Sequence, residues 1–163
     1  MHTPAHPAPA LRRALRTIAM LLLASSPCQA QEEPRSNYFN DPFVQVTDGL
    51  PACPTQKGPQ ITQAEVLTQT HYRAERGTSC YHAGRCRLPN SYLYDQEIIP
   101  RVQKALRVDG SFGDTRVWAE GQRRWVWLKG CVRTQEQSQR IEQLVRGIDD
   151  VEAVINELVV LDR

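Results

Sequence analysis

The sequence lacks the signatures of several large functional classes. It holds no Gly-x-Ser-x-Gly, His-Glu-x-x-His or phosphate-binding glycine loop, the local motifs of serine hydrolases, zinc proteases and nucleotide-binding enzymes. A net charge of +2 over 163 residues is too small for a nucleic-acid binder that depends on electrostatic attraction. The length also argues against a large multidomain enzyme. We therefore expect a protein without enzymatic activity, cofactor or nucleic-acid partner.

The apolar run at residues 17–24 is too short to cross a bilayer, which needs roughly 20 apolar residues. It follows Arg12, Arg13 and Arg16 and precedes a stretch of small residues that ends at Ala30. This order is typical of a secretory signal peptide that is cleaved after Ala30. Cleavage would change the net charge from +2 to −1 and leave no transmembrane segment. We expect a periplasmic or secreted protein.

Turn-forming residues interrupt residues 31–93 so often that only one convincing helix fits between them. Thr62 and Glu65 form a capping box at its start, and Gly77 is expected to end it. Helical spacing gives this helix one narrow inward face of Ala64, Leu67, His71 and Ala74. Because this loop-rich extension is too small to bury a core alone, we expect disulfides or a neighbouring domain to hold it.

Regular elements begin near Asp95, which is expected to cap a helix, although Pro100 predicts a kink or a later start. The helix carries an apolar stripe of Ile98, Ile99, Val102, Ala105 and Leu106. Two strands, about 115–120 and 124–132, follow as a hairpin that turns near Gly121-Gln122.

A second capping box, Thr134 with Gln137, opens another helix. Its inward residues are Ile141, Leu144, Val145 and Ile148. Asp149-Asp150 then turns the chain into a last strand at residues 151–161. The order αββαβ predicts a two-layer α+β domain, with both helices on one face of a three-stranded mixed sheet.

Three motifs in this half stand in a recognisable order: Val102-x-x-Ala105-Leu106, Val126-x-Leu128-x-Gly130-x-Val132 and Val151-x-x-Val154-x-Asn156-x-Leu158. Together they resemble the BON domain, a family named for bacterial osmotic-shock and nodulation proteins, over about residues 94–161. One departure is Asp150, where the family commonly has glycine. The resemblance implies a periplasmic setting in Gram-negative bacteria and no enzymatic activity. It further implies a role in envelope integrity or stress response, with binding of anionic phospholipid in some members.

Strand alternation places all three tryptophans on the sheet face opposite the helices. Trp118, Trp125 and Trp127 share that face with Cys131 and with Ile155, Val159 and Leu161. An exposed surface of this kind would favour association. Residues 31–93 are expected to cover it, whereas direct contact of the tryptophans with lipid or a partner is the alternative.

Cleavage would remove Cys28 and leave an even set of four cysteines, which in an oxidising compartment predicts two disulfides with three possible connectivities. We favour Cys80–Cys86 with Cys53–Cys131, because Cys131 has partners only in the extension. A zinc site of His71, Cys80, His82 and Cys86 is disfavoured, since its spacing is not standard and disulfide formation competes for both thiols. We expect no metal.

Two cationic surfaces are candidates for contact with anionic phospholipid head groups. The first is a strip along the helix, formed by Arg101, Lys104 and Arg107. The second is the hairpin, where Arg123 and Arg124 precede Trp125.

We therefore predict a signal peptide at 1–30, a cysteine-containing extension at 31–93 and a BON-like domain at 94–163. The predicted function is non-enzymatic maintenance of the envelope through contact with anionic phospholipid or an envelope component. The alternative is a disulfide-stabilised interaction module that serves a secretion or surface assembly.

Overall fold

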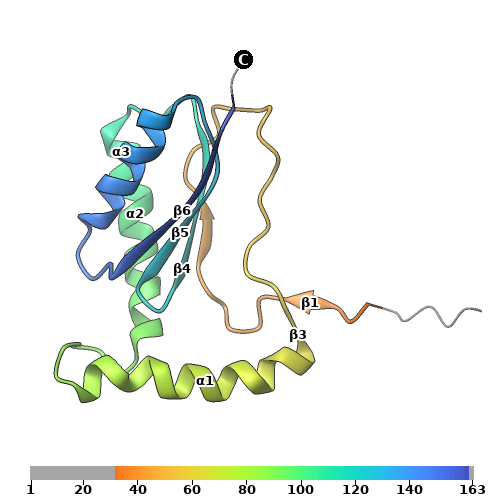
Figure 1. The fold of residues 1–163 in the computed structure, drawn as a ribbon, viewed down its shortest axis with the longest axis vertical. Helices are drawn as coiled ribbons and strands as arrows, with labels where there is room; N and C mark the ends of the chain where they lie inside the picture. Colours follow the sequence, from red (N-terminus) through yellow and green to blue (C-terminus); the bar gives the residue numbers. More distant parts are fainter. Residues whose placement is uncertain (1–31, 162–163) are drawn as a thin grey trace, which may run out of the picture. The chain divides into compact units, whose positions relative to one another are not determined.

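The computed structural model describes residues 32–161, so the predicted signal peptide lies outside the described residues. A four-stranded sheet has the order β2-β4-β5-β6 (Figure 1), with strands Phe43–Gln45, Arg116–Gln122, Trp125–Val132 and Ala153–Val160. The β2–β4 and β4–β5 pairs are antiparallel, and β5–β6 is parallel. The mixed α+β fold is as predicted, but the predicted number of three strands is wrong. The extension adds β2 to the edge of β4, pairing Val44 with Ala119.

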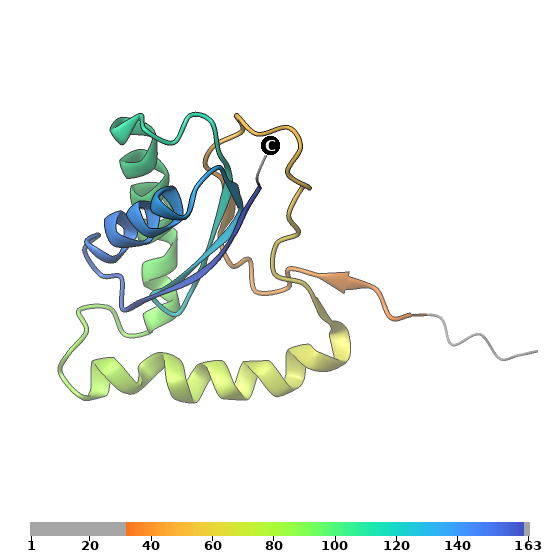
Figure 2. The same cartoon turned by 45° about the horizontal axis from the view of Figure 1, so that its top comes forward.

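Two helices cover one face of this sheet, as Figures 1 and 2 show: α2, Asp95–Asp109, and α3, Gln135–Arg146. Their buried residues, Ile98, Ile99, Val102, Leu106, Ile141 and Val145, pack on Val117, Ala119, Val126, Leu128 and Val132 of the strands. The capping box of α3 is present as predicted, because the Gln137 N–H donates to Thr134 Oγ1 at 3.2 Å. Burial of these side chains from both layers supplies the main stabilising term of the fold.

The start of α2 differs from the prediction. A short 3₁₀ turn, η1 (Ser91–Tyr94), leads directly into α2, so the helix begins at Asp95 and contains Pro100. A later start was therefore wrong. Asp95 is the first helical residue rather than its cap, and its carboxylate points to the β4–β5 hairpin.

The hairpin turn lies at Arg123-Arg124, two residues beyond the predicted position. Gly121 belongs to β4, where it pairs with Val126, and a Cβ there would lie 2.7 Å from Cγ1 of Ile99 in α2. Glycine here permits close packing of helix on strand rather than a turn. Asp150, where the family commonly has glycine, has φ 72° and adopts the left-handed conformation itself.

Helix α1, Gln63–His82, belongs to the extension (Figure 2) and follows a small two-stranded sheet of β1, Arg35–Ser36, and β3, Ile61–Thr62. Its predicted capping box is present: the Glu65 N–H donates to Thr62 Oγ1, and the Thr62 N–H donates to Glu65 Oε2. Its predicted end at Gly77 is wrong. Gly77 is buried inside the helix, and a Cβ there would lie 2.4 Å from Oδ1 of Asn90, so the glycine permits close contact between α1 and Asn90.

The predicted inward face of α1 is also wrong. Leu67 is 77% exposed, and Arg73 lies on the side that packs against the rest of the extension. There Arg73 forms an ion pair with the buried Asp41, and its guanidinium lies between the rings of Phe39 and Tyr92. An ion pair and a glycine, rather than an apolar stripe, define how this helix packs.

The second face of the sheet is covered in part by the extension. Leu50 and Cys53 bury Trp118 and Cys131, and the Cys53–Cys131 disulfide joins the two layers, as predicted. Figure 1 shows this segment running along the side of the sheet opposite α2 and α3. Trp125 and Trp127 stay partly exposed and Val159 is 56% exposed, so the cover does not reach the β5–β6 side completely.

Candidate functional site

The turn between β4 and β5 places two consecutive arginines in the left-handed backbone conformation. Arg123 has φ 59° and Arg124 has φ 68°. Two-residue hairpin turns of this kind strongly prefer Asn-Gly or related pairs. A residue with a Cβ costs about 1–2 kcal/mol in this conformation. Backbone stability alone therefore does not favour two bulky residues at these positions.

The side chain of Asp95 holds this turn in place through hydrogen bonds. Its two carboxylate oxygens accept the backbone N–H of Arg123 at 2.6 Å and of Arg124 at 2.7 Å. The side chain is buried, and this burial raises the pKa of Asp95 to about 7, although the two N–H donors oppose the shift. The first residue of α2 thus positions both arginines.

The two arginine side chains have different partners. The Arg124 guanidinium donates to the carbonyl oxygen of Asp150 at 2.8 Å and to Sγ of Cys86 at 3.2 Å. The Arg123 guanidinium lies over the ring of Trp125, 4.8 Å from its centre. Arg124 therefore connects the turn to neighbouring segments, whereas Arg123 stacks on Trp125.

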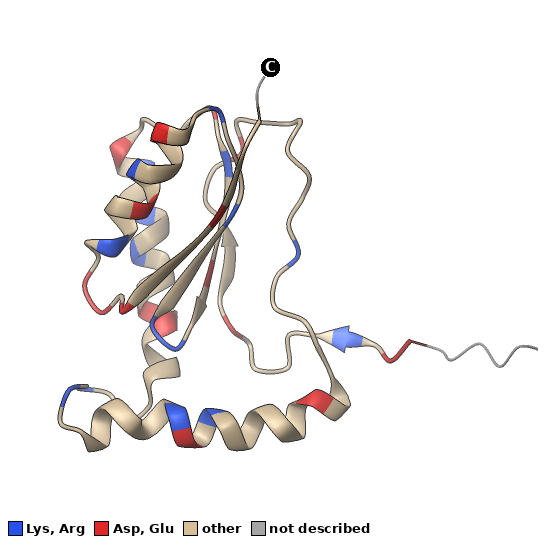
Figure 3. Cartoon of the chain, viewed as in Figure 1, with Lys and Arg blue, Asp and Glu red and all other residues tan. Residues whose placement is uncertain are grey.

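An arginine-lined cleft of about 310 Å³ opens beside this turn. We call it the arginine cleft; its lining residues are Arg76, Ser79, Cys80, Arg85, Ser91, Arg123, Arg124 and Glu152. They come from the C-terminal half of α1, the loop that follows it, η1, the hairpin turn and the residue before β6. Figure 3 shows basic residues of α1, of its following loop and of the hairpin turn gathered at this end of the molecule.

The charges in the arginine cleft are unbalanced. Glu152 is its single acidic residue and lies 4.0 Å from Arg124. Within residues 32–161, no carboxylate lies within 4 Å of the guanidinium nitrogens of Arg76, Arg85 or Arg123, since none of the ion pairs there involves them. Guanidinium groups that line one cleft without counter-charges suit an anionic ligand, above all phosphate or carboxylate.

Comparison with protein families agrees with this architecture. Residues 94–162 match the family model of the BON domain. The C-terminal part of this chain is a BON domain. The family is a non-catalytic binding type, associated with envelope proteins and with phospholipid binding. No curated protein matches the chain.

The extension contributes five of the eight residues that line the arginine cleft, and the BON domain contributes three. The disulfide Cys80–Cys86, which forms as predicted, closes the loop that carries Arg85. Cys80 itself lines the cleft, and Cys86 contacts Arg124 of the BON domain. Both cysteines of the disfavoured zinc site, Cys80 and Cys86, are therefore joined in a disulfide.

The sequence-predicted cationic residues are divided by the structure. Arg101 donates to the carbonyl oxygen of Asp149 at 2.8 Å and pairs with Asp150 at 3.2 Å, so it fastens α2 of the BON domain to the turn before β6. Lys104 and Arg107 are exposed on α2 and do not line the arginine cleft. Of the predicted hairpin set, Arg123 and Arg124 line the cleft, and Trp125 supports Arg123 from beside it.

Two arginines of the arginine cleft, Arg76 and Arg85, were not identified from the sequence as candidates for binding an anion. Arg76 lies on α1 with its guanidinium 4.0 Å from the ring centre of Tyr72. Arg85 lies inside the short Cys80–Cys86 loop. The predicted pairing of those cysteines marks this loop as fixed, but no pattern in the sequence places it next to the hairpin of the BON domain.

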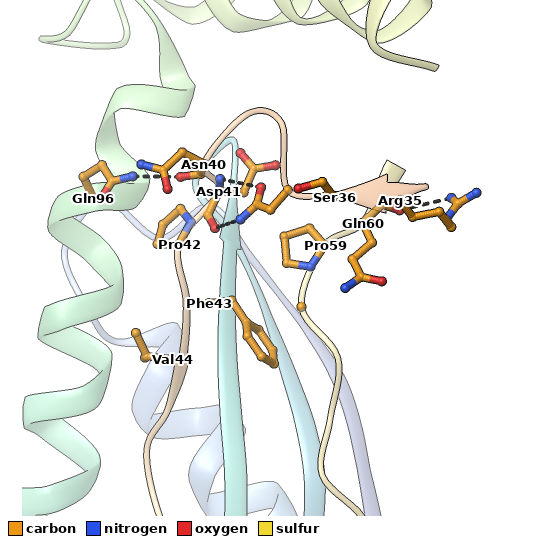
Figure 4. Close-up of a pocket in the computed structure, with 12 residues that line it drawn as sticks. Arg35, Ser36, Asn40, Asp41, Pro42, Phe43, Val44, Pro59, Gln60 and Gln96 are labelled. Carbon is orange, nitrogen blue, oxygen red and sulfur yellow. Dashed lines mark hydrogen bonds between the residues drawn. The ribbon is translucent and has the colours of Figure 1, made fainter. Parts of the chain in front are cut away.

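A second depression, of about 480 Å³, lies between β2 and the segment before β3 (Figure 4). Amide side chains of Asn40, Gln60 and Gln96 line it, with Phe43 along one wall. Its two charged lining residues are neutralised, since Asp41 pairs with Arg73, and Arg35 pairs with Glu65 at 3.1 Å. This depression offers no excess charge, so the arginine cleft is the stronger candidate for an anionic ligand.

Proposed function

We propose that this protein is a non-enzymatic, exported envelope protein that contributes to envelope integrity by contact with anionic phospholipid at the arginine cleft. The observation that carries the proposal is the Arg123-Arg124 turn. Two arginines occupy strained backbone positions, supported by a buried carboxylate, beside two further arginines without acidic partners. The family association with the envelope and with phospholipid binding supports the same conclusion.

Local charge must supply the attraction in this protein, because its predicted mature net charge of −1 does not. Each basic side chain near an anionic membrane surface contributes about 1 kcal/mol to binding. The cleft offers Arg76, Arg85 and Arg123, and indole and phenol rings beside them suit the membrane interface. Among residues 32–161, no helix has the length and apolar character to cross a bilayer, so this contact is peripheral.

Vesicle flotation tests the proposal. The mature protein should float with vesicles that contain phosphatidylglycerol and not with pure phosphatidylcholine vesicles, and added salt should weaken the association. Arg76→Glu with Arg85→Glu should lower partitioning at least about tenfold, because both side chains are exposed and line the cleft. This double variant should keep the wild-type melting temperature, since neither residue is buried.

A matched control uses the other cationic surface. Lys104→Glu with Arg107→Glu makes the same change in net charge on α2, outside the cleft. The proposal requires this variant to bind almost as the wild type does. Loss of binding in the α2 variant with retention in the cleft variant would assign the membrane contact to α2 instead.

A second candidate function rests on a different observation. The partly exposed Trp127 and the exposed Val159 leave an apolar area on the sheet beside β6, whose outer edge is unpaired in the described sheet. This surface suits an interaction module for a secretion or surface assembly. Absence of binding to any anionic vesicle at low salt, with capture of an envelope protein that Trp127→Ser abolishes, would favour this function over the first.

A further inference from the structure

The number of unpaired guanidinium groups in the arginine cleft limits the type of anion that it fits. Arg76, Arg85 and Arg123 have no acidic partner among the described residues, and Arg124 has Glu152 at 4.0 Å. The lining thus carries a clear excess of positive charge within a volume of about 310 Å³. A phosphodiester brings one negative charge and two terminal oxygens to such a site. A phosphomonoester brings about −1.5 to −2 charges near pH 7 and three terminal oxygens.

Other donors in the arginine cleft are already used within the protein. The Ser79 hydroxyl donates to the carbonyl oxygen of Arg76 at 2.9 Å, and the Ser91 hydroxyl donates to that of Gly77 at 3.0 Å. Neither serine therefore has a hydrogen free for a bound oxygen. Recognition of an anion here depends on guanidinium groups, which bind phosphate oxygens through pairs of parallel N–H donors.

Aromatic rings hold two of these guanidinium planes. Arg76 stacks on Tyr72 at 4.0 Å and Arg123 on Trp125 at 4.8 Å, measured from the guanidinium carbon to the ring centre. A stacked guanidinium uses its face for the ring and keeps its N–H edge for an acceptor. The edges are thus partly oriented before any ligand arrives, which lowers the entropy lost on binding.

We infer that the arginine cleft recognises a terminal phosphomonoester, and that it prefers this group to a phosphodiester when the membranes that carry them have equal surface charge density. The inference rests on the proposed function and names its ligand chemistry. A phosphatidic acid headgroup and a soluble sugar or glycerol phosphate share this group, and experiment separates these two sources.

The test compares two vesicle types at pH 7.5, matched in zeta potential: phosphatidylcholine with phosphatidic acid, and phosphatidylcholine with phosphatidylglycerol. The mature wild-type protein should bind the phosphatidic acid vesicles at least about fivefold more tightly, since one additional charge-assisted hydrogen bond is sufficient for this difference. Lowering the pH to 5.5 should reduce the preference, because the monoester becomes singly charged.

A charge-conserving variant separates general attraction from recognition. Arg76→Lys with Arg85→Lys keeps the net charge but removes two planar guanidinium forks. This variant should still bind both vesicle types and should lose the preference for phosphatidic acid. Arg107→Lys, on α2 and outside the cleft, should keep the preference.

Glycerol 3-phosphate, added alone and followed by calorimetry, reports on the soluble source. Equal affinity for both vesicle types, or a preference that survives Arg76→Lys with Arg85→Lys, refutes the phosphomonoester inference and leaves the proposed function standing. Binding to neither vesicle type, with cleft-dependent binding of glycerol 3-phosphate, refutes the membrane function and supports monoester recognition. Absence of all three associations refutes both.

Discussion

The buried carboxylate of Asp95 should make the stability of this protein fall as the pH rises through neutrality. Asp95 is 1% exposed, and burial raises its pKa to about 7 from an unfolded value of about 3.9. Between these two values the folded protein holds a proton that the unfolded chain releases. Stability from this proton is therefore complete below about pH 4 and is lost as the pH rises through 7.

The full difference between the two pKa values corresponds to about 4 kcal/mol, and the part that falls between pH 5 and pH 8 to about 2–3 kcal/mol. Asp95→Asn should remove this dependence, because an amide does not titrate. The variant should also cost about 1–3 kcal/mol at pH 5, since its single amide oxygen serves only one of the two N–H donors of Arg123 and Arg124.

Urea unfolding at pH 5, 6, 7 and 8 measures both effects, with wild type and variant compared at each pH. From pH 5 to pH 8 the difference in the free energy of unfolding between wild type and variant should shift by about 2–3 kcal/mol in favour of the variant. Asp109→Asn, at the opposite end of the same helix, is the control. The pKa of Asp109 is lowered by its hydrogen bonds with Ser111, so its titration lies below this window. Parallel pH curves for wild type and Asp95→Asn would refute the assignment of the proton to Asp95.

Further predictions concern the disulfides and one glycine. Cys53→Ala with Cys131→Ala opens a bridge across 78 residues and should lower the free energy of unfolding by about 4–5 kcal/mol, as chemical denaturation would show. Cys80→Ser with Cys86→Ser opens a bridge across only 6 residues and should lower the free energy of unfolding by about 2 kcal/mol. This variant should nevertheless weaken vesicle binding more than Cys53→Ala with Cys131→Ala does, because Arg85 lies in the Cys80–Cys86 loop. The opposite ranking in flotation would contradict the role given to the Cys80–Cys86 loop. Gly130→Ala should cost at least about 3 kcal/mol in the same denaturation assay, because φ is 116° and the new Cβ would lie 2.1 Å from the carbonyl oxygen of Arg116. A change close to zero in the free energy of unfolding would contradict this prediction, because it would mean that β4 and β5 can move apart at Gly130 without loss of stability.

The sequence predicts those parts of the fold that depend on short-range patterns. The two capping boxes at Thr62 and Thr134 are present because a cap needs only residues three positions apart. The alternation along β5 correctly divides Val126 and Leu128 from the Trp127 side, since a strand's period is fixed by its geometry.

Apart from the Cys53–Cys131 disulfide and the cover over Trp118, features that depend on contacts between distant segments were not predicted. Strand β2 is only three residues long, too short for its period to be detected, and its pairing with β4 is visible only in three dimensions. The packing side of α1 is set by the Arg73–Asp41 ion pair and by Gly77 against Asn90, so hydrophobic periodicity indicated the wrong face.

The same distinction between short-range and long-range features applies to the candidate site. Arg123 and Arg124 were identified because they are neighbours in sequence and adjoin a tryptophan. Arg76 and Arg85 were not, because α1 and its loop reach the hairpin only through the folded extension. Arg101 shows the converse case: a charge that looks available in the sequence is engaged with Asp149 and Asp150.

The extension has a consequence for the modular independence of the BON domain. Residues 94–162 match the family, but β2 covers the edge of β4, and Leu50 with Cys53 shields Trp118. A chain that starts at Tyr94 would expose a seven-residue strand edge next to an uncovered indole, a combination that favours intermolecular strand pairing. Transfer of the BON domain into another protein would therefore require that the extension be included. The part of the chain that matches the family model is therefore shorter than the part that covers its own strand edge and Trp118.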